Sequence, residues 1–294
     1  MKTFFKFLLL WVSLTLLTVL LSVVLPYSVV FQEANMHYLF PKNVVYLTVN
    51  CFWISLTIVF FARKSPKTKV QTALALSLSL FFIYAVISQT EVVIFNKLFV
   101  LLSRKDMVWI IVNRGVPVVL IIILSVILLQ NEYNYAKYLR PIRSMAFADW
   151  IIKPILTGIG YVAVYFVFNY YVAERTEAVR LFYTGKSEYP EFIVRLTEYW
   201  NTTPSLFGIL FIKGLLFGIF ILPIVNMFRR KSTQMFTAIL LAYETTAAAW
   251  LIPSGFFPDA VRIGHLEEAI LSMFAFAFIT WILFDKIKLS RSSE

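Results

Sequence analysis

The sequence predicts an all-α protein, a polytopic integral membrane helix bundle with about eight transmembrane helices and short interfacial helices. Of its 294 residues, 60% are hydrophobic and 15% are charged, whereas soluble domains average about 45–50% and about 25%. The apolar residues form runs of about 20 residues, the length that crosses the hydrocarbon core as a helix. Basic residues gather between these runs, as in membrane topologies. We therefore expect one transmembrane domain over residues 1–294, in a lipid bilayer.

The first expected span covers residues 4–31, which are apolar apart from Lys6 and a few hydroxyl groups. It starts like a signal peptide, but its apolar run exceeds the roughly 7–15 residues of a cleavable segment. We expect it to be retained, with Pro26 kinking its far end. The second and third spans cover residues 44–62 and 70–88, and a short basic loop separates them.

The middle of the chain offers one further span and two segments that could lie at the membrane surface. Residues 91–102 are apolar but include Glu91 and Lys97, so they could lie flat at the interface or lengthen the third span. The fourth span covers residues 107–129. In residues 135–149, basic and apolar side chains alternate, which is typical of an interfacial segment.

The fifth span covers residues 151–172, and the longest polar stretch, residues 173–203, follows it as an extracytoplasmic segment. Within this stretch, Pro190 is expected to open a short helix. That helix would rest on the membrane or on the bundle through one face, and the face would carry Phe192, Ile193, Leu196 and Trp200. The sixth, seventh and eighth spans cover residues 204–228, 235–252 and 263–284.

The distribution of Lys and Arg predicts the orientation. With eight spans and a cytoplasmic N-terminus, more than half of the 27 basic residues fall in cytoplasmic segments. The positive-inside rule then places both termini in the cytoplasm, in a plasma membrane or a bacterial inner membrane. An additional pass at residues 91–102 would reverse every later segment.

Ionisable residues inside the spans predict the functional site, because a charged group at membrane depth is costly and usually functional. With the expected threading, these residues gather in the outer half of the bundle. Arg262, His265 and Glu268 lie three residues apart along the eighth span, so they would share one face of its helix. The substrate-binding candidates are Arg114, Lys213, Glu244, Arg262, His265 and Glu268.

A different interpretation of the same residues is structural. Lys213 and Glu244 could pair across the sixth and seventh spans, which would lower the cost of burying each charge. Polar pairs of this kind can serve simply as contacts between helices. Arg262 and Glu268 could likewise mark the water interface.

The charges of the six candidates indicate the chemistry of a ligand. Three are basic, which suits a small anionic solute or a lipid-linked headgroup. Histidine is a side chain that can exchange a proton near neutral pH, and carboxylates can act as acid or base, so the catalytic candidates are Glu244, His265 and Glu268. We expect binding or transport of an anionic solute, with an intramembrane enzyme acting on a lipid-linked substrate at the outer leaflet as one alternative. The other is a scaffold that assembles with membrane protein partners and has no substrate.

Several classes of function lack their sequence motifs. There is no phosphate-binding loop of the Walker type, no His-Glu-x-x-His and no Gly-x-Ser-x-Gly. We therefore expect no cofactor and no metal, and we favour a protein that is not an enzyme. Cys51 lies in an apolar run, where a lone cysteine is usually a small packing residue. Despite the net charge of +11, nucleic acid is not an expected partner, because the basic residues are explained by membrane topology.

Overall fold

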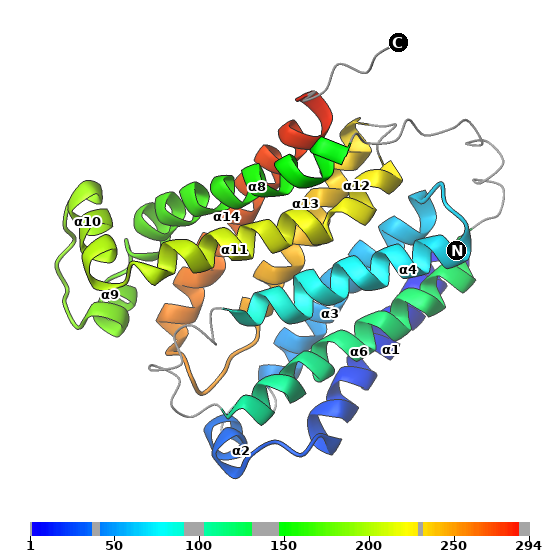
Figure 1. Ribbon diagram of the computed structural model, residues 1–294. Coiled ribbons are helices and arrows are strands. Elements are labelled where there is room, and N and C mark those ends of the chain that lie inside the picture. Colours follow the sequence, from blue (N-terminus) through cyan, green and yellow to red (C-terminus); the bar gives the residue numbers. More distant parts are fainter. Residues whose placement is uncertain (1, 37–41, 91–102, 131–146, 229–231, 288–294) are drawn as a thin grey trace.

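The computed structural model describes residues 2–36, 42–90, 103–130, 147–228 and 232–287, and every regular element in these ranges is helical (Figure 1). This confirms the predicted all-α class. The segment 91–102 and most of the expected interfacial segment 135–149 lie outside the described residues.

Seven helical stretches within the described ranges are long and apolar enough to cross a membrane. Three of them continue beyond a regular α-helix: α4 extends through η1 (Phe81–Val86) and η2 (Ile87–Gln89), α8 extends through η3 (Asn169–Ala173), and α14 extends through η5 (Ile282–Lys286). A fourth consists of α11 followed by α12 (Leu222–Phe228). The helices that begin the seven stretches are α1 (Lys2–Val24), α3 (Lys42–Lys64), α4 (Lys69–Leu80), α6 (Arg104–Leu129), α8 (Phe147–Phe168), α11 (Ser205–Phe220) and α14 (Asp259–Trp281).

The seventh expected span, residues 235–252, corresponds to α13 (Ser232–Ala248), a helix of 17 residues. At 1.5 Å per residue it is about 26 Å long, slightly shorter than a typical hydrocarbon core. A short 3₁₀ segment, η4 (Ala249–Leu251), follows it. Most residues in the second half of α13 are buried within the bundle. The fold is therefore that of a multi-pass membrane protein.

The first span is shorter than its sequence predicts. The helix α1 ends at Val24, and the separate helix α2 (Val29–Met36) begins beyond Pro26. The carboxylate of Asp106 holds this break, because it accepts hydrogen bonds of 2.7 Å from both the backbone N–H and the hydroxyl of Ser28. Asp106 also forms a capping box with Ser103 at the start of α6. A proline alone would only kink the span, whereas this contact fixes a turn against a neighbouring helix.

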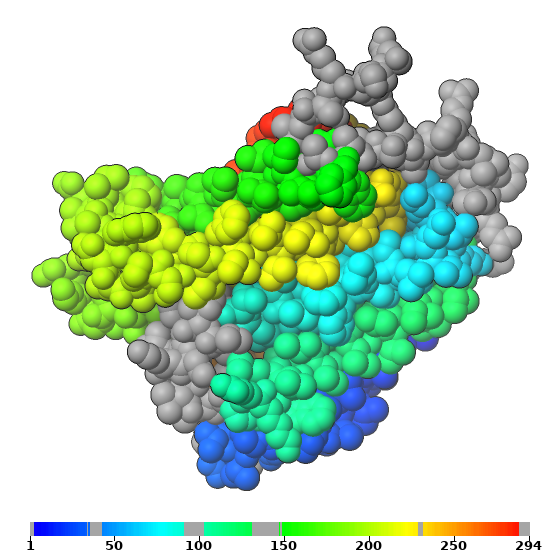
Figure 2. Space-filling model, viewed as in Figure 1, coloured from blue at the N-terminus to red at the C-terminus, as the bar shows by residue number. Residues whose placement is uncertain are grey.

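The helices form two groups that lie side by side (Figure 1). The N-terminal group contains α1, α3, α4 and α6, and the C-terminal group contains α8, α11, α13 and α14. The groups meet where α4 packs on α11 and where α3 packs on α13. Figure 2 shows α11 (yellow) directly against α4 (cyan) on one face of the molecule. One apolar core runs through both groups.

Two short helices, α9 (Glu177–Thr184) and α10 (Phe192–Thr202), lie beyond one end of the bundle (Figure 1). We call this the α9–α10 end, and the first turn of α1 lies at the opposite end. The helix expected after Pro190 is α10, but its apolar residues do not all face the same way. Phe192 and Leu196 pack on the core, whereas Ile193 and Trp200 are 66% and 60% exposed.

Candidate functional site

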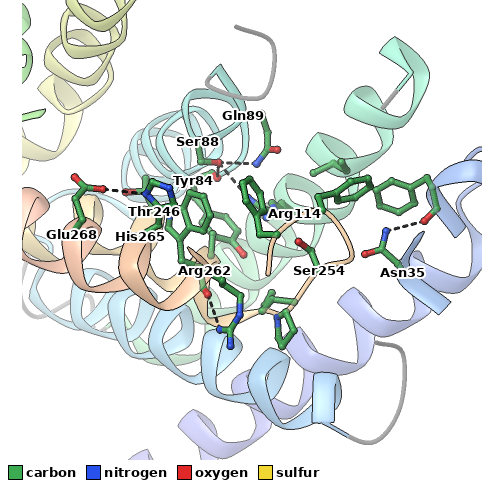
Figure 3. Close-up of a pocket in the computed structure, with 18 of the residues that line it drawn as sticks. Asn35, Tyr84, Ser88, Gln89, Arg114, Thr246, Ser254, Arg262, His265 and Glu268 are labelled. Atoms are coloured by element: carbon green, nitrogen blue, oxygen red, sulfur yellow. Dashed lines mark hydrogen bonds and ion pairs between the residues drawn. The ribbon is translucent and has the colours of Figure 1, made fainter. Parts of the chain in front are cut away.

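A cavity of about 1100 Å³ lies at the α9–α10 end, between the two helix groups. One wall comes from α1, α2, α3 and α6 and from the segments η1 and η2 that continue α4, and the other comes from α8, α9, α10, α11, α13 and α14. The loop that joins α13 to α14 also lines it, through residues 249–257. Figure 3 shows side chains from both walls turned toward the same space. The charged and imidazole side chains of the lining are Arg114, Glu174, Lys186, Arg195, Glu198, Arg262, His265 and Glu268.

Local departures from α-helix contribute polar groups to this cavity. The π-helical segment η1 carries Tyr84, and the second π-helical segment, η3 (Asn169–Ala173), carries Asn169. Both residues line the cavity. The hydroxyl of Tyr84 donates to Oδ1 of Asn50 over 3.1 Å, and Nδ2 of Asn50 donates to the carbonyl of Ala248 over 2.6 Å. These hydrogen bonds give the backbone carbonyl at the end of α13 a partner, which a polar backbone group needs when no water can reach it inside a membrane.

Arg114 enters the cavity from the N-terminal group, about 15 Å along α6 from Arg104. Its Nη1 donates to Oγ of Ser88 over a long 3.4 Å, and its guanidinium carbon lies 5.9 Å from the centre of the Tyr84 ring (Figure 3). Among the residues that the structure describes, no carboxylate forms an ion pair with it. Arg114 therefore presents a positive charge that the described side chains do not neutralise.

His265 lies on the opposite wall, between three side chains (Figure 3). Its Nε2 is 2.9 Å from the hydroxyl of Tyr183, and the Trp250 ring stacks on its imidazole at 4.8 Å. Its Nδ1 is 4.0 Å from Oε2 of Glu268, beyond hydrogen-bonding distance. The imidazole is thus held in one orientation, with a carboxylate close to its second nitrogen.

Arg262 lines the cavity but uses its donors on the protein itself. Its Nε lies 3.1 Å from Oδ1 of Asp259. Its Nη1 donates to the carbonyls of Trp250 and Leu251, over 3.1 and 3.0 Å. The guanidinium also lies 5.3 Å from the centre of the Tyr46 ring. Arg262 therefore braces the loop between α13 and α14 against α3.

The structure divides the six predicted binding residues. Four of them, Arg114, Arg262, His265 and Glu268, line the cavity, whereas Lys213 and Glu244 are not among its lining residues. Lys213 is buried, and its Nζ lies 5.3 Å from the centre of the Tyr161 ring. Glu244 is also buried. A role for either residue in ligand binding stays a prediction.

A second charged group on the cavity wall was not predicted from the sequence. Arg195 on α10 pairs with Glu174 over 2.7 Å and with Glu198 over 2.8 Å. Glu174 also accepts hydrogen bonds from the Tyr199 hydroxyl and, over 2.9 Å, from Nδ2 of Asn169. The sequence does show that Arg195, Glu198 and Tyr199 have the i, i+3 and i+4 spacing of side chains that meet on one helix face. That spacing gives no indication that Glu174 would join them.

The environment of this group alters two acid–base equilibria. Burial raises the pKa of the Tyr199 hydroxyl, and the negative charge of Glu174 raises it further. Burial works to lower the pKa of Arg195, but its bonds to Glu174 and Glu198 more than offset this, so the pKa is raised overall. Arg195 therefore stays charged and committed to its two carboxylates.

Comparisons with protein-family models, with curated proteins and with solved structures find no match to the chain. The fold and the cavity define a multi-pass helical membrane protein with a polar space between two helix groups. Within the described residues, no group of three or more His, Cys, Asp or Glu side chains could hold a metal ion.

Proposed function

We propose that this protein binds an anionic solute in the cavity and transports it across the membrane, with Arg114 as the main contact for the anion. The observation that carries the proposal is the charge of Arg114, which no described carboxylate pairs. A buried or half-buried cation is costly without a counter-charge. A bound oxyanion would supply that charge and accept the parallel N–H groups of the guanidinium.

The position of the cavity favours transport over simple binding. Its walls belong to two separate helix groups, so a bound ligand would contact both. Many transporters bind their substrate between two such units and move one against the other. The breaks after Ala248 and at Ile221, between α11 and α12, give the C-terminal group two places that can bend.

The proposal is tested with purified protein in lipid nanodiscs, using inorganic phosphate and acetate as separate probes. A ligand that binds the folded state raises its unfolding temperature, so at least one probe should do so for the wild type. Arg114→Ala should lose this effect without losing its own stability, and Arg114→Lys should retain part of it. Lys105→Ala removes an exposed cation on the same helix and serves as the control.

Transport is then measured in proteoliposomes with the radiolabelled form of whichever probe binds. Uptake above that of protein-free vesicles, lost in Arg114→Ala and kept in Lys105→Ala, is the expected result. If neither of these probes nor the larger organic anion tested below shifts the unfolding temperature in a way that depends on Arg114, the proposed function is wrong.

A second candidate function is an intramembrane enzyme that acts on a lipid-linked substrate, and the pair Tyr183 and His265 favours it. An imidazole 2.9 Å from a hydroxyl, with the carboxylate of Glu268 4.0 Å from its other nitrogen, has the arrangement of a general base. His265→Gln separates the two functions. It should keep Arg114-dependent binding in either case, but an enzyme would lose product formation, while a transporter would keep uptake. The scaffold alternative is less favoured, because a scaffold needs no cavity of this size.

A further inference from the structure

The wall around Arg114 is otherwise free of charge. Within the described residues, Arg114 is the charged side chain that the N-terminal group contributes to the cavity lining. Apolar side chains from three helices line the same wall, namely Val19 on α1, Leu47 on α3 and Ile110 on α6. Ile110 precedes Arg114 by one helical turn, so the two share a face of α6. The wall therefore holds one cation among uncharged side chains, some polar and some apolar, which suits a ligand that has both an anionic group and an apolar part.

The size of the cavity leads to the same conclusion. A water molecule takes about 30 Å³ in the liquid, so a simple inorganic anion would fill a small part of the 1100 Å³. Sites for organic ligands usually measure about 300–1,000 Å³ and are mostly apolar, with a few polar groups that fix orientation. The cavity is therefore large enough for an anion that carries a body of several carbon atoms.

Aromatic rings and an opening beside α1 add to this picture. The rings of Phe31 and Phe256 lie 5.7 Å apart, and those of Trp250 and Phe257 lie 5.2 Å apart, and all four residues line the cavity. Val23 also lines it and is 79% exposed. The cavity therefore reaches the molecular surface next to a transmembrane helix, where apolar ligands can enter.

We propose that the ligand is an amphiphilic organic anion, with its carboxylate or phosphate at Arg114 and its apolar body against Val19, Leu47 and Ile110. This inference rests on the proposed function, because it specifies the class of the anion. Such a ligand could be a soluble organic acid or a single-chain lipid. The two share an oxyanion on an apolar body, and the experiment below distinguishes them by the phase from which the ligand is supplied.

The test compares three probes with the protein in nanodiscs: octanoate, its neutral counterpart octanamide, and acetate. Octanoate should bind at least about tenfold more tightly than acetate, since burial of two methylene groups is enough for that factor. It should also bind at least about tenfold more tightly than octanamide, because a charge-assisted bond to Arg114 would be lost in the amide. Oleate preloaded into the nanodisc lipids then competes with octanoate only if the site also takes ligands from the membrane.

Two variants on one helix test the apolar body. Val19→Thr keeps the shape of a side chain that lines the cavity and should weaken octanoate binding several-fold while leaving acetate binding unchanged. Val12→Thr makes the same change on α1 at an exposed residue outside the cavity lining and should change neither. Unfolding temperatures of both variants confirm that each remains folded.

The outcomes separate this inference from the proposed function. If acetate or phosphate binds through Arg114 but octanoate binds no more tightly, the amphiphile is excluded and the proposed function stands. If octanamide binds as tightly as octanoate and Arg114→Ala changes neither, the cavity is an apolar site and both proposals fail. If Val19→Thr and Val12→Thr weaken octanoate binding equally, the apolar body does not lie where we place it.

Discussion

The guanidinium of Arg195 and the carboxylate of Glu174 form an ion pair of 2.7 Å that joins α10 to the C-terminal end of η3. Both side chains are largely buried, and Glu174 also accepts bonds from Asn169 and Tyr199. These contacts fix α10 beside the cavity, although Glu174 comes before α9 in the sequence and Arg195 comes after it. The pair therefore sets the position of one cavity wall.

We expect Glu174→Gln to destabilise the protein by about 3 kcal/mol, because removing one partner leaves the other charge buried with fewer bonds. The free energy of unfolding, measured by denaturant titration in detergent, checks this. Glu188→Gln changes an exposed carboxylate in the same polar stretch and should leave stability within about 0.5 kcal/mol. Equal stability of the two variants would show that the ion pair contributes little.

The tyrosines of the α9–α10 end predict a loss of stability at high pH. Burial and the Glu174 charge raise the pKa of Tyr199, and burial with a hydrogen bond to Tyr170 raises the pKa of Tyr189 to about 12. A raised folded-state pKa means that the folded protein holds its proton more tightly than the unfolded chain. This stabilisation is complete below the ordinary tyrosine pKa of 10.0 and is lost as the pH rises through the folded-state values.

The corresponding measurement is the unfolding temperature between neutral pH and about pH 12, the upper limit set by Tyr189. Tyr199→Phe should be less stable than the wild type at neutral pH and should lose less stability above pH 10.0, where unfolded tyrosines begin to ionise. Parallel curves for the two proteins would show that Tyr199 does not contribute to the alkaline loss.

The class of fold followed from the sequence because apolar run length is a property of single segments. The break between α1 and α2 was harder to predict. Pro26 marked its place, but the turn depends on Ser28 contacting Asp106 from a distant part of the chain. Sequence alone therefore predicted a kink where the structure has two helices.

The candidate site was predicted in part for a related reason. The spacing of Arg262, His265 and Glu268 places them on one face of a single helix, and all three line the cavity. The direction in which Lys213 points depends on how α11 packs on α8. The close approach of Gly214 to Tyr161 sets that rotation, and periodicity within one helix does not reveal it.

The glycines of α11 allow a direct test of this packing. A Cβ added to Gly214 would lie 2.4 Å from Cβ of Tyr161 and 2.9 Å from Cα of Gly158. We expect Gly214→Ala to force α8 and α11 apart and to destabilise the protein by about 1–3 kcal/mol. A Cβ added to Gly208, on the same helix, would meet nothing within 4 Å.

Gly208→Ala is the matched control, and it should be neutral or stabilise α11 by up to about 1 kcal/mol through helix propensity. Thermal unfolding of the two variants under identical conditions checks the difference. If Gly214→Ala were as stable as Gly208→Ala, the close contact between α8 and α11 would not be a determinant of the fold.

The predicted orientation, with both termini in the cytoplasm, can be tested with single cysteines. The chain has one cysteine, Cys51, which is 1% exposed and should not react with a membrane-impermeant maleimide. Lys186→Cys, at the cavity, should be labelled in intact cells, and Lys64→Cys, at the C-terminal end of α3, should be labelled only after permeabilisation. Both lysines are exposed, so access depends on the side of the membrane. The reverse pattern would place the cavity on the cytoplasmic side, and the anion would then be bound from inside the cell.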